Sequence, residues 1–434
     1  MLLHILNFAF LFLLFVPTNA WWILAHDSLT QDRLDPIVTP GEVAYHVHNV
    51  IGSSGFGPTV STESLQDANC TTAPVQVDKS AYWAPQLYHH DHENGTFTLV
   101  PIQYVQTYYL QRPQSSADKS QEVKAFPAGL RMLAGALRTS YNASNQEDRA
   151  VNFVCLDYDG GSSQSDQLPD KSCPDGLRAQ VVFPSCWDGV NLDSEDHKSH
   201  MSYPLGTVPD SGDCPDSHPV KVIQLFHEWI FETNKFELEP GVKDFVFATG
   251  DETGLTFHAD FVSAWDVDVL QAAIDQCTGS LFNGVENCPP FVASIDEEIA
   301  KSCKIARRVE EEIDGPLTVL PGCNPVPYTG EATCENLTTP AIKDYTGGDE
   351  SAQPTDSAVS TVVTSASASS ATPAASTSSD PPLSVSVSIG VTTSPPVLLA
   401  STASPTASET SSWTCSKMQK KRTKKRHHAI LQHY

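Results

Sequence analysis

The sequence lacks the short motifs that identify several large enzyme classes. It contains no G-x-S-x-G turn, no P-loop and no dinucleotide-binding glycine fingerprint, which removes the commonest serine-hydrolase and nucleotide-dependent activities. None of its eleven cysteines forms a C-x-x-C pair, which argues against zinc ribbons and thioredoxin-like chemistry. Basic residues are also scarce: 26 Lys and Arg stand against 52 Asp and Glu, giving a formal net charge of −26. Such a chain repels nucleic acid and anionic lipid surfaces, though not neutral sugars.

The one long apolar run lies at the N-terminus. Leu2–Val16 is almost unbroken hydrophobic sequence, long enough for the apolar region of a signal peptide and too short to span a bilayer. The small residues Thr18 and Ala20 stand three and one before a cut that would start the mature chain at Trp21. We therefore predict that residues 1–20 are a signal peptide and that the protein is secreted and extracellular.

Cysteine and asparagine usage agrees with secretion. Cysteines without metal-type spacing favour disulfides in an oxidising compartment, and an odd count leaves one thiol over, for which the isolated Cys415 is the candidate. Four N-x-S/T acceptors, which mark exposed loops in secreted proteins, begin at Asn69, Asn94, Asn142 and Asn336. We predict a disulfide-rich glycoprotein.

The C-terminal part has little that could form a core. Residues 346–412 are mostly Ser, Thr, Ala, Pro and Val, a composition that predicts a disordered, O-glycosylated stalk; an unmodified linker is the alternative. Residues 413–434 form a basic tail, which could hold anionic wall polymers or simply be solvated. This tail does not end in the apolar segment of a glycolipid anchor, so we predict no transmembrane or lipid anchor.

The body, residues 21–345, is predicted to be a single globular domain whose part from 278 to 345 is a Cys-rich helical extension. In this body apolar residues recur mainly at every second position. Val43, Tyr45 and Val47, for example, alternate with polar or small residues. This period predicts half-buried strands with those three side chains on the buried face.

Other segments complete the predicted fold. Long extended runs cover residues 96–110 and 220–233, and residues 245–262 read as a hairpin. Helical pattern is confined to Asp268–Gln276 and to residues 294–313, which open with a Ser294/Glu297 capping box. The sequence therefore predicts a mainly β protein, a β-sandwich or jelly roll, with a few peripheral helices.

Histidines occur in patterns that favour a metal centre. His46 and His48 are two apart on a predicted strand and therefore share one face, as do His258 and Asp260. If these pairs converge, imidazoles and a carboxylate would suit a divalent transition metal with an open position for water or substrate. The alternative is two polar strand faces that make ordinary hydrogen bonds.

A cut after Ala25 would offer a different metal site. It would leave His26 as the N-terminal residue, as in copper-dependent polysaccharide oxygenases, whose metal is held by the terminal amine and ring. Ile23 is a poor residue three before a cleavage site, so we favour the cut before Trp21.

A polar loop between residues 183 and 204 is the second candidate site. His200, Asp193 and Tyr203 are candidate catalytic groups there, because a histidine base with a tyrosine acid, or paired carboxylates, could cleave a sugar polymer. Trp187 and Asp188 in the loop and Arg131 outside it are candidates for substrate binding. The alternative is an Asx-rich structural loop, with calcium bound by acidic and amide oxygens. His197 and His200 are three apart and would meet on one helical turn.

Several motifs resemble one family of secreted fungal proteins. They run through most of residues 21–277 and include Arg33-Leu-Asp35-Pro36, Asp78-Lys79-Ser80-Ala-Tyr82-Trp83, Cys173-Pro-Asp-Gly-Leu-Arg178, the loop 183–204, and His258-Ala-Asp260-Phe261. On these motifs the chain resembles domain-of-unknown-function family nineteen-ninety-six. The resemblance implies an extracellular protein, often joined to wall-associated or sugar-binding modules, and implies no catalytic residues.

Three classes of function follow from the sequence. The first is an enzyme, metal-dependent, that hydrolyses, eliminates or oxidises cell-wall or plant polysaccharide. The second is a non-catalytic protein that binds the cell wall or its polysaccharides. The third is a surface protein that contacts a host. Whether the protein is an enzyme is left open by the sequence.

Overall fold

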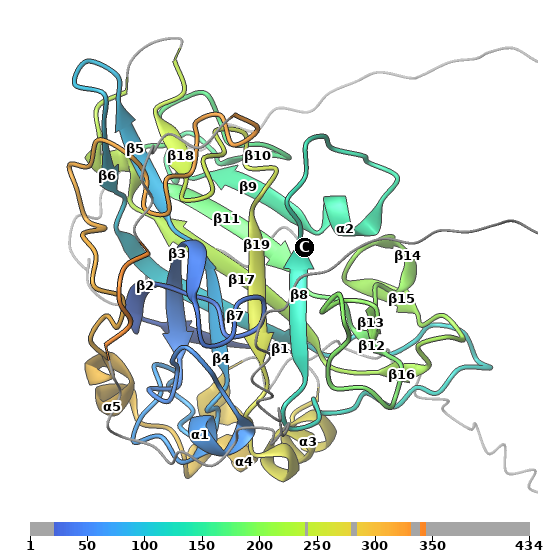
Figure 1. Cartoon of the computed structure of the whole chain (residues 1–434). Helices are drawn as coiled ribbons and strands as arrows, with labels where there is room; N and C mark the ends of the chain where they lie inside the picture. The colour runs from blue at the N-terminus through green and yellow to red at the C-terminus, as the bar shows by residue number, and fades with distance from the viewer. Residues whose placement is uncertain (1–20, 239–241, 279–283, 331–338, 344–434) are drawn as a thin grey trace, which may run out of the picture. The chain divides into compact units, whose positions relative to one another are not determined.

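Two large antiparallel sheets dominate the computed structural model of the protein (Figure 1), which describes residues 21–238, 242–278, 284–330 and 339–343. The six-stranded sheet has the order β1 (Trp21–His26), β7 (Ile102–Leu110), β17 (Gln224–Phe231), β11 (Leu177–Val182), β9 (Val151–Cys155) and β10 (Ser163–Ser165). The five-stranded sheet has the order β2 (Thr30–Leu34), β3 (Val43–Gly52), β4 (Ala81–Pro85), β19 (His258–Val262) and β8 (Arg131–Gly135).

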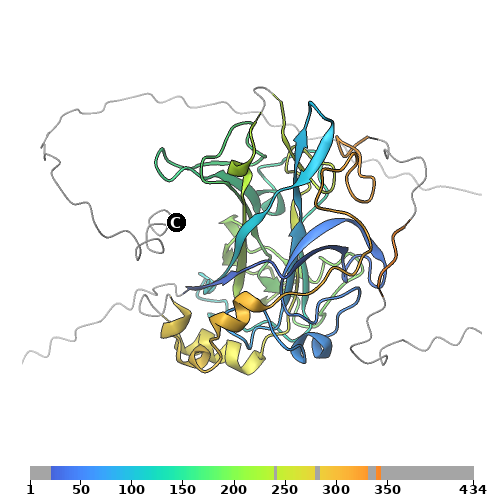
Figure 2. The ribbon, with the colours of Figure 1, turned by 90° about the vertical axis from the view of Figure 1, so that its left-hand side faces the viewer.

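Smaller sheets and short helices surround these two. The small sheets are β13 (Met201–Ser202), β12 (Cys186–Trp187) and β16 (Val220–Lys221); β14 (Leu205–Val208) and β15 (Ser211–Asp213); and β18 (Phe245–Phe247), β5 (Leu87–Asp91) and β6 (Thr96–Leu99). The α-helices are α1 (Thr62–Gln66), α2 (Gln146–Arg149), α3 (Val267–Gln276), α4 (Pro289–Val292) and α5 (Glu297–Ser302), and two 3₁₀ turns cover Thr233–Lys235 and Val285–Asn287. Helices α1, α3, α4 and α5 gather at one end of the molecule in both views (Figures 1 and 2). No helix in the described ranges is long and apolar enough to cross a membrane.

The main core lies between the two large sheets. Phe261 of β19 packs against Phe183, which follows β11, with ring centroids 6.3 Å apart, and Tyr82 of β4 meets His227 of β17 at 5.3 Å. A second apolar cluster includes Val50 and Trp83 of the five-stranded sheet. Because successive strand residues point to opposite faces, Trp83 lies on the outer face when Tyr82 lies on the inner one. The five-stranded sheet is thus covered on both faces, and the fold is the predicted mainly β sandwich.

Disulfides tie this body together, as cysteine usage predicts. The bonds join Cys70 to Cys303, Cys155 to Cys173, Cys186 to Cys214 and Cys277 to Cys288. Cys323 is also disulfide-bonded. The Cys70–Cys303 bond closes 233 residues of sequence, and it fastens the chain after α5 to the segment after α1. Cys415 and the predicted signal peptide, stalk and basic tail lie outside the described residues.

In β3, Val47 is buried as predicted, but Tyr45 is not, and the opposite face is buried as well. Tyr45 is 72 % exposed, whereas Ala44 and His46 are buried, and from His46 onward every residue of the strand is buried. The apolar and the polar faces are both covered because the outer face carries the second cluster. A period-two pattern predicts the alternation of side chains, but it does not show which face of a sheet the rest of the chain will cover.

The predicted hairpin over residues 245–262 does not form. β18 pairs with β5, whereas β19 pairs with β4 and β8 in another sheet. The Asp251 carboxylate accepts the backbone N–H groups of Thr253 and Thr256, and this turn directs the two strands into separate sheets. Each long extended run is also divided, into β6 and β7 and into β16 and β17.

The two predicted helices have different outcomes. α3 forms as predicted and buries Leu270, Ala273 and Ile274. In the second segment only α5 is helical, and its N-cap is Asp296, whose side chain accepts the N–H of Ile299. The Ser294 hydroxyl donates instead to the carbonyl of Phe291, so the predicted capping box is wrong.

Candidate metal centre

The histidines of β3 and β19 lie on the outer face of the five-stranded sheet. His48 is paired with Pro85 of β4, and Asp260 is paired with Trp83 of the same strand. Continuing that register by two residues places His258 on the other side of Pro85. Residues that are opposite one another across neighbouring strands point to the same face, so His48 and His258 approach each other over Pro85. His46, two residues before His48, shares that face.

Three imidazoles meet at this point. The Nε2 atoms of His46 and His258 are 3.3 Å apart, and the ring centroid of His48 lies 4.3 Å from that of His46 and 5.9 Å from that of His258. One nitrogen from each ring falls within 4.8 Å of one nitrogen from each of the others. Among the described residues this is the one group of at least three His, Cys, Asp or Glu side chains so arranged.

Backbone carbonyls fix the tautomers of two of these rings. The Nδ1 of His48 lies 3.0 Å from the carbonyl oxygen of Leu34, and the Nδ1 of His258 lies 2.7 Å from that of Thr256. A carbonyl only accepts, so each Nδ1 carries the proton and each Nε2 presents its lone pair. Metal-bound histidines are oriented by such an outer contact.

Several polar atoms at the site have no hydrogen-bond partner. The Nε2 of His48 and both carboxylate oxygens of Asp260 are buried and make no hydrogen bond. Asp260 is fully buried, and its nearer oxygen lies 4.0 Å from the Nε2 of His258. A buried polar atom without a partner is destabilising by about 1–3 kcal/mol, and a buried charge by more. This cluster is therefore incomplete by itself.

Burial keeps the three rings neutral. It lowers the pKa of His48 to about 3 and that of His258 to about 4, and it lowers the pKa of His46 well below its usual value. Burial also raises the pKa of the Asp260 carboxyl well above its usual value. Without a cation the site therefore favours neutral imidazoles and a protonated acid, and a bound cation would reverse the preference of the acid.

One buried carboxylate beside the site was not identified from the sequence. Asp35 is buried, and its Oδ1 accepts the N–H groups of Ile37 and Val38. Burial raises its pKa, while the accepted N–H of Val38 and the nearby charge of His258 oppose that rise. Its charge in turn raises the pKa of Asp260. The Asp35-Pro36 turn after β2 is a weak signal for this position, because its approach to β19 depends on the tertiary fold.

The predicted catalytic residues His200 and Tyr203 make complete sets of contacts elsewhere. The Nδ1 of His200 lies 2.8 Å from the hydroxyl of Ser194, and its Nε2 lies 2.7 Å from the carbonyl oxygen of Arg131. The Tyr203 hydroxyl donates to the carbonyl of Val182 at 2.9 Å, and burial raises its pKa well above the usual value. These contacts favour structural roles for both side chains.

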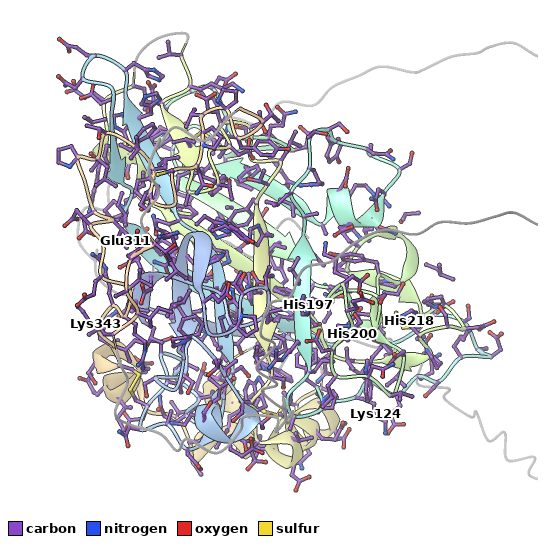
Figure 3. All side chains as sticks on the ribbon, viewed as in Figure 1. Lys124, His197, His200, His218, Glu311 and Lys343 are labelled. Carbon is purple, nitrogen blue, oxygen red and sulfur yellow. A yellow bond between two sulfur atoms is a disulfide. The ribbon has the colours of Figure 1, made fainter. Side chains whose placement is uncertain are left out.

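His197 and His200 do not share a helical turn. His197 has a φ of +56°, in the left-handed region, and its Nδ1 lies 2.8 Å from an oxygen of Asp193. Arg131 lies 3.8 Å from the other Asp193 oxygen, and it also donates to the carbonyl of Val60. Figure 3 shows His197 and His200 beside β8. Asp193 is thus joined to His197, a pairing that the sequence prediction missed.

The predicted substrate-binding residues of the loop serve its own turn. Both Asp188 oxygens accept from Asn191, one from its backbone and one from its side-chain amide, and the first also accepts the N–H of Val190. The Trp187 indole donates to the carbonyl of Asn191, and its ring packs against the core. This is the pattern of an Asx-rich structural loop.

The N-terminal copper alternative does not fit the structure. β1 pairs with β7 along its whole length, from Trp21 opposite Leu110 to His26 opposite Val105. His26 is buried, and its two ring nitrogens contact the hydroxyls of Thr72 and Thr107. A cut after Ala25 would remove a paired strand from the sheet.

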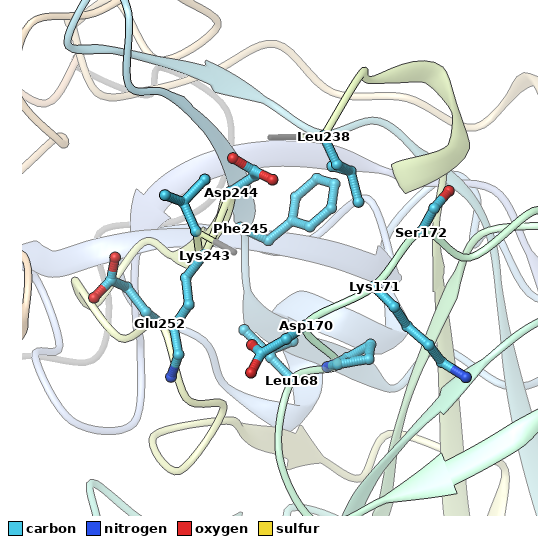
Figure 4. Close-up of a pocket in the computed structure, with 11 residues that line it drawn as sticks. Leu168, Asp170, Lys171, Ser172, Leu238, Lys243, Asp244, Phe245 and Glu252 are labelled. Carbon is cyan, nitrogen blue, oxygen red and sulfur yellow. The ribbon is translucent and has the colours of Figure 1, made fainter. Parts of the chain in front are cut away.

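The remaining predicted sites lie at the surface or outside the described chain. Asn69, Asn94 and Asn142 are exposed, as glycosylation requires, and Asn336 lies outside the described residues. A hollow between Leu168–Ser172 and β18 is drawn in Figure 4 and is lined by charges of both signs. No predicted site residue lines this hollow.

Comparison with known proteins places the chain in a family. The model of the family described as a domain of unknown function, DUF1996, matches residues 35–265, more than half of the chain. The protein belongs to this family. The match covers both histidine-bearing strands and the loop 183–204. No curated protein and no solved structure matches the chain.

Proposed function

We propose that this DUF1996 protein binds one divalent transition metal through the Nε2 atoms of His46, His48 and His258, with Asp260 as the charged carboxylate. The observation that carries the proposal is the convergence of three buried imidazoles on one point, beside the unpartnered Nε2 of His48 and the unpartnered oxygens of Asp260. Nitrogens bound at 2.0–2.1 Å to a tetrahedral zinc ion are about 3.3 Å apart, which is the separation of the His46 and His258 nitrogens.

The electrostatics support the same assignment. Three neutral imidazoles leave the charge of the ion intact, and Asp260 and Asp35 supply negative charge nearby. Asp260 lies farther from the His258 nitrogen than a tetrahedral ligand would, at 4.0 Å. A metal held by the three imidazoles would keep a fourth position for water, and as a Lewis acid it would lower the pKa of that water.

The compartment and substrate class form a second part of the proposal. The predicted signal peptide, the disulfides and three exposed acceptor asparagines support a secreted glycoprotein. We propose a metal-dependent enzyme that acts on neutral wall or plant polysaccharide, because the net charge of −26 disfavours polyanionic substrates. A non-catalytic wall protein with a structural metal is the second candidate, and it is favoured by the low exposure of the ligands, from 0 to 9 %.

Elemental analysis of the purified secreted protein tests the metal. We expect about one transition-metal ion per chain, and its loss in the variant His46→Ala/His48→Ala. The control variant His89→Ala/His92→Ala removes two imidazoles from the β5–β6 hairpin and should keep the metal. Wild-type protein that holds no stoichiometric metal after incubation with zinc, copper, manganese or cobalt would overturn the proposal.

A further inference from the structure

The loop that carries His197 is anchored on the strand beside the histidine cluster. The Lys198 amine contacts the carbonyl oxygen of Gly135 at 2.5 Å and the carboxylate of Glu147. Gly135 is the residue of β8 that pairs with His258. The charge of Lys198 lowers the pKa of both His258 and Asp260. His197 is the residue that precedes Lys198 in this loop.

A carboxylate orients the His197 ring. The Asp193 oxygen lies 2.8 Å from Nδ1, and a carboxylate accepts, so Nδ1 carries the proton and Nε2 presents a lone pair. The His197 side chain is 28 % exposed, which leaves it accessible to water. This is the carboxylate–histidine arrangement of a general base, in which the acid fixes the tautomer and stabilises the imidazolium.

Electrostatics connect this pair to the metal centre. Burial raises the pKa of Asp35, and the charges of both His258 and His197 oppose that rise. Asp35 therefore lies within electrostatic reach of a proposed metal ligand and of the His197 ring. The same loop contributes Lys198, whose charge acts on the proposed ligands. Lys198 thus acts on the proposed ligands, and His197 acts on the neighbouring Asp35.

The backbone of His197 lies in the left-handed region. A φ of +56° is uncommon outside glycine, although histidine, asparagine and aspartate adopt it more often than other residues. The following turn maintains it, because one Asp196 oxygen accepts the N–H groups of Lys198 and Ser199 and the hydroxyl of Ser194. Non-glycine residues held in this region occur preferentially at functional sites.

We propose that Asp193 and His197 form the acid–base dyad of the metal centre, a role that rests on the proposed metal. If a metal held a water here, His197 would accept one water proton at Nε2 and the water oxygen would attack the sugar carbon. The glycosidic C–O bond would break, and His197 would give its proton to the departing sugar oxygen. Asp193 is a positioning residue that keeps the Nδ1 proton. The dyad favours hydrolysis of a neutral polysaccharide, in which a base activates water, over oxidation.

Cobalt-substituted protein tests the dyad without a known substrate. Bound Co²⁺ has visible absorption bands that change when its water ionises, so the pH midpoint of that change can be measured. The variant His197→Asn removes the base but suits the left-handed backbone, because asparagine tolerates it. We expect full cobalt binding and a midpoint raised by about one pH unit. Asp193→Asn should raise the midpoint less, and the control His218→Asn should leave it unchanged.

The outcomes separate the two proposals. If His197→Asn binds one Co²⁺ and titrates as the wild type does, the dyad is overturned and the metal centre stands. If wild-type protein binds no Co²⁺ at all, the metal centre is overturned, and the dyad with it. Near-ultraviolet circular dichroism verifies that each variant is folded. If His197→Asn does not fold, His197→Gly serves in its place, because glycine adopts the same φ.

Discussion

The histidine cluster and the loop 183–204 are both rich in polar side chains, yet they differ in how those side chains are satisfied. In the loop, Asp188 accepts three N–H groups, and both nitrogens of His200 have partners. In the cluster, His48 has a nitrogen and Asp260 has two oxygens that are buried without partners. The loop uses its polar groups to hold its own shape, whereas the cluster leaves buried groups that the proposed metal would satisfy.

The difference concerns stability as well as function. A fold tolerates buried, unpartnered groups when a ligand satisfies them, and a ligand at 100 times its Kd stabilises the native state by about 2.7 kcal/mol. The loop 183–204, whose polar groups already have hydrogen-bond partners, needs no ligand to stabilise it. Paired substitutions in the two regions can therefore separate ligand-binding groups from structural ones.

The largest contrast should come from removing a carboxylate in each region. Asp260→Asn should weaken metal binding about 10- to 100-fold, because the charge that faces the ion is lost. Asp188→Asn, the matched change in the loop, should leave the affinity unchanged and cost about 1 kcal/mol of stability. Competition with a chelator of known affinity measures the first effect, and urea unfolding the second. Equal metal affinities for the two variants would contradict a metal-binding role for Asp260.

The next effect concerns pH. The pKa of His48 lies at about 3 in the native state and near 6.5 when unfolded. The unfolded state therefore binds the proton first, and stability falls as pH falls from about 6.5 toward 3. At pH 5 the loss of stability that His48 causes is on the order of 2 kcal/mol.

The variant His48→Leu, studied without metal, measures this contribution of His48 to the loss of stability. It should lose less stability than wild-type protein between pH 7 and pH 5, as followed by urea unfolding with a chelator present. His26 and His227 are also buried with lowered pKa values. The stability of the variant should therefore still fall with pH, but less steeply than that of the wild type. Parallel pH profiles for the two proteins would contradict the neutral, buried state of His48.

The smallest effect is expected in the loop region. Tyr203→Phe removes one hydrogen bond to the carbonyl of Val182 and should lower the free energy of unfolding by about 1 kcal/mol. Metal content should stay at the wild-type value by elemental analysis. A large loss of activity with intact stability, once an activity is assayed, would show that the phenol has the catalytic role that the sequence predicts.

Local sequence patterns predict much of the fold. The predictions that are wrong concern particular turns and caps. The mainly β class and α3 were predicted because alternation and a helical apolar face are short-range signals. The hairpin over residues 245–262 failed because Asp251 closes a turn that sends β18 and β19 into different sheets. The helix predicted from Ser294 forms only as the six-residue α5, which begins after its cap Asp296 and ends before Cys303.

The sequence by itself determined that His46 and His48 share one face of a strand and that His258 and Asp260 share another, because side chains alternate along an extended chain. Tertiary structure decided that the two faces are the same face of one sheet, that they meet over Pro85, and that the chain covers them. Strand order and burial are long-range properties. They turn two ordinary His-x-His and His-x-Asp patterns into one incomplete, buried cluster.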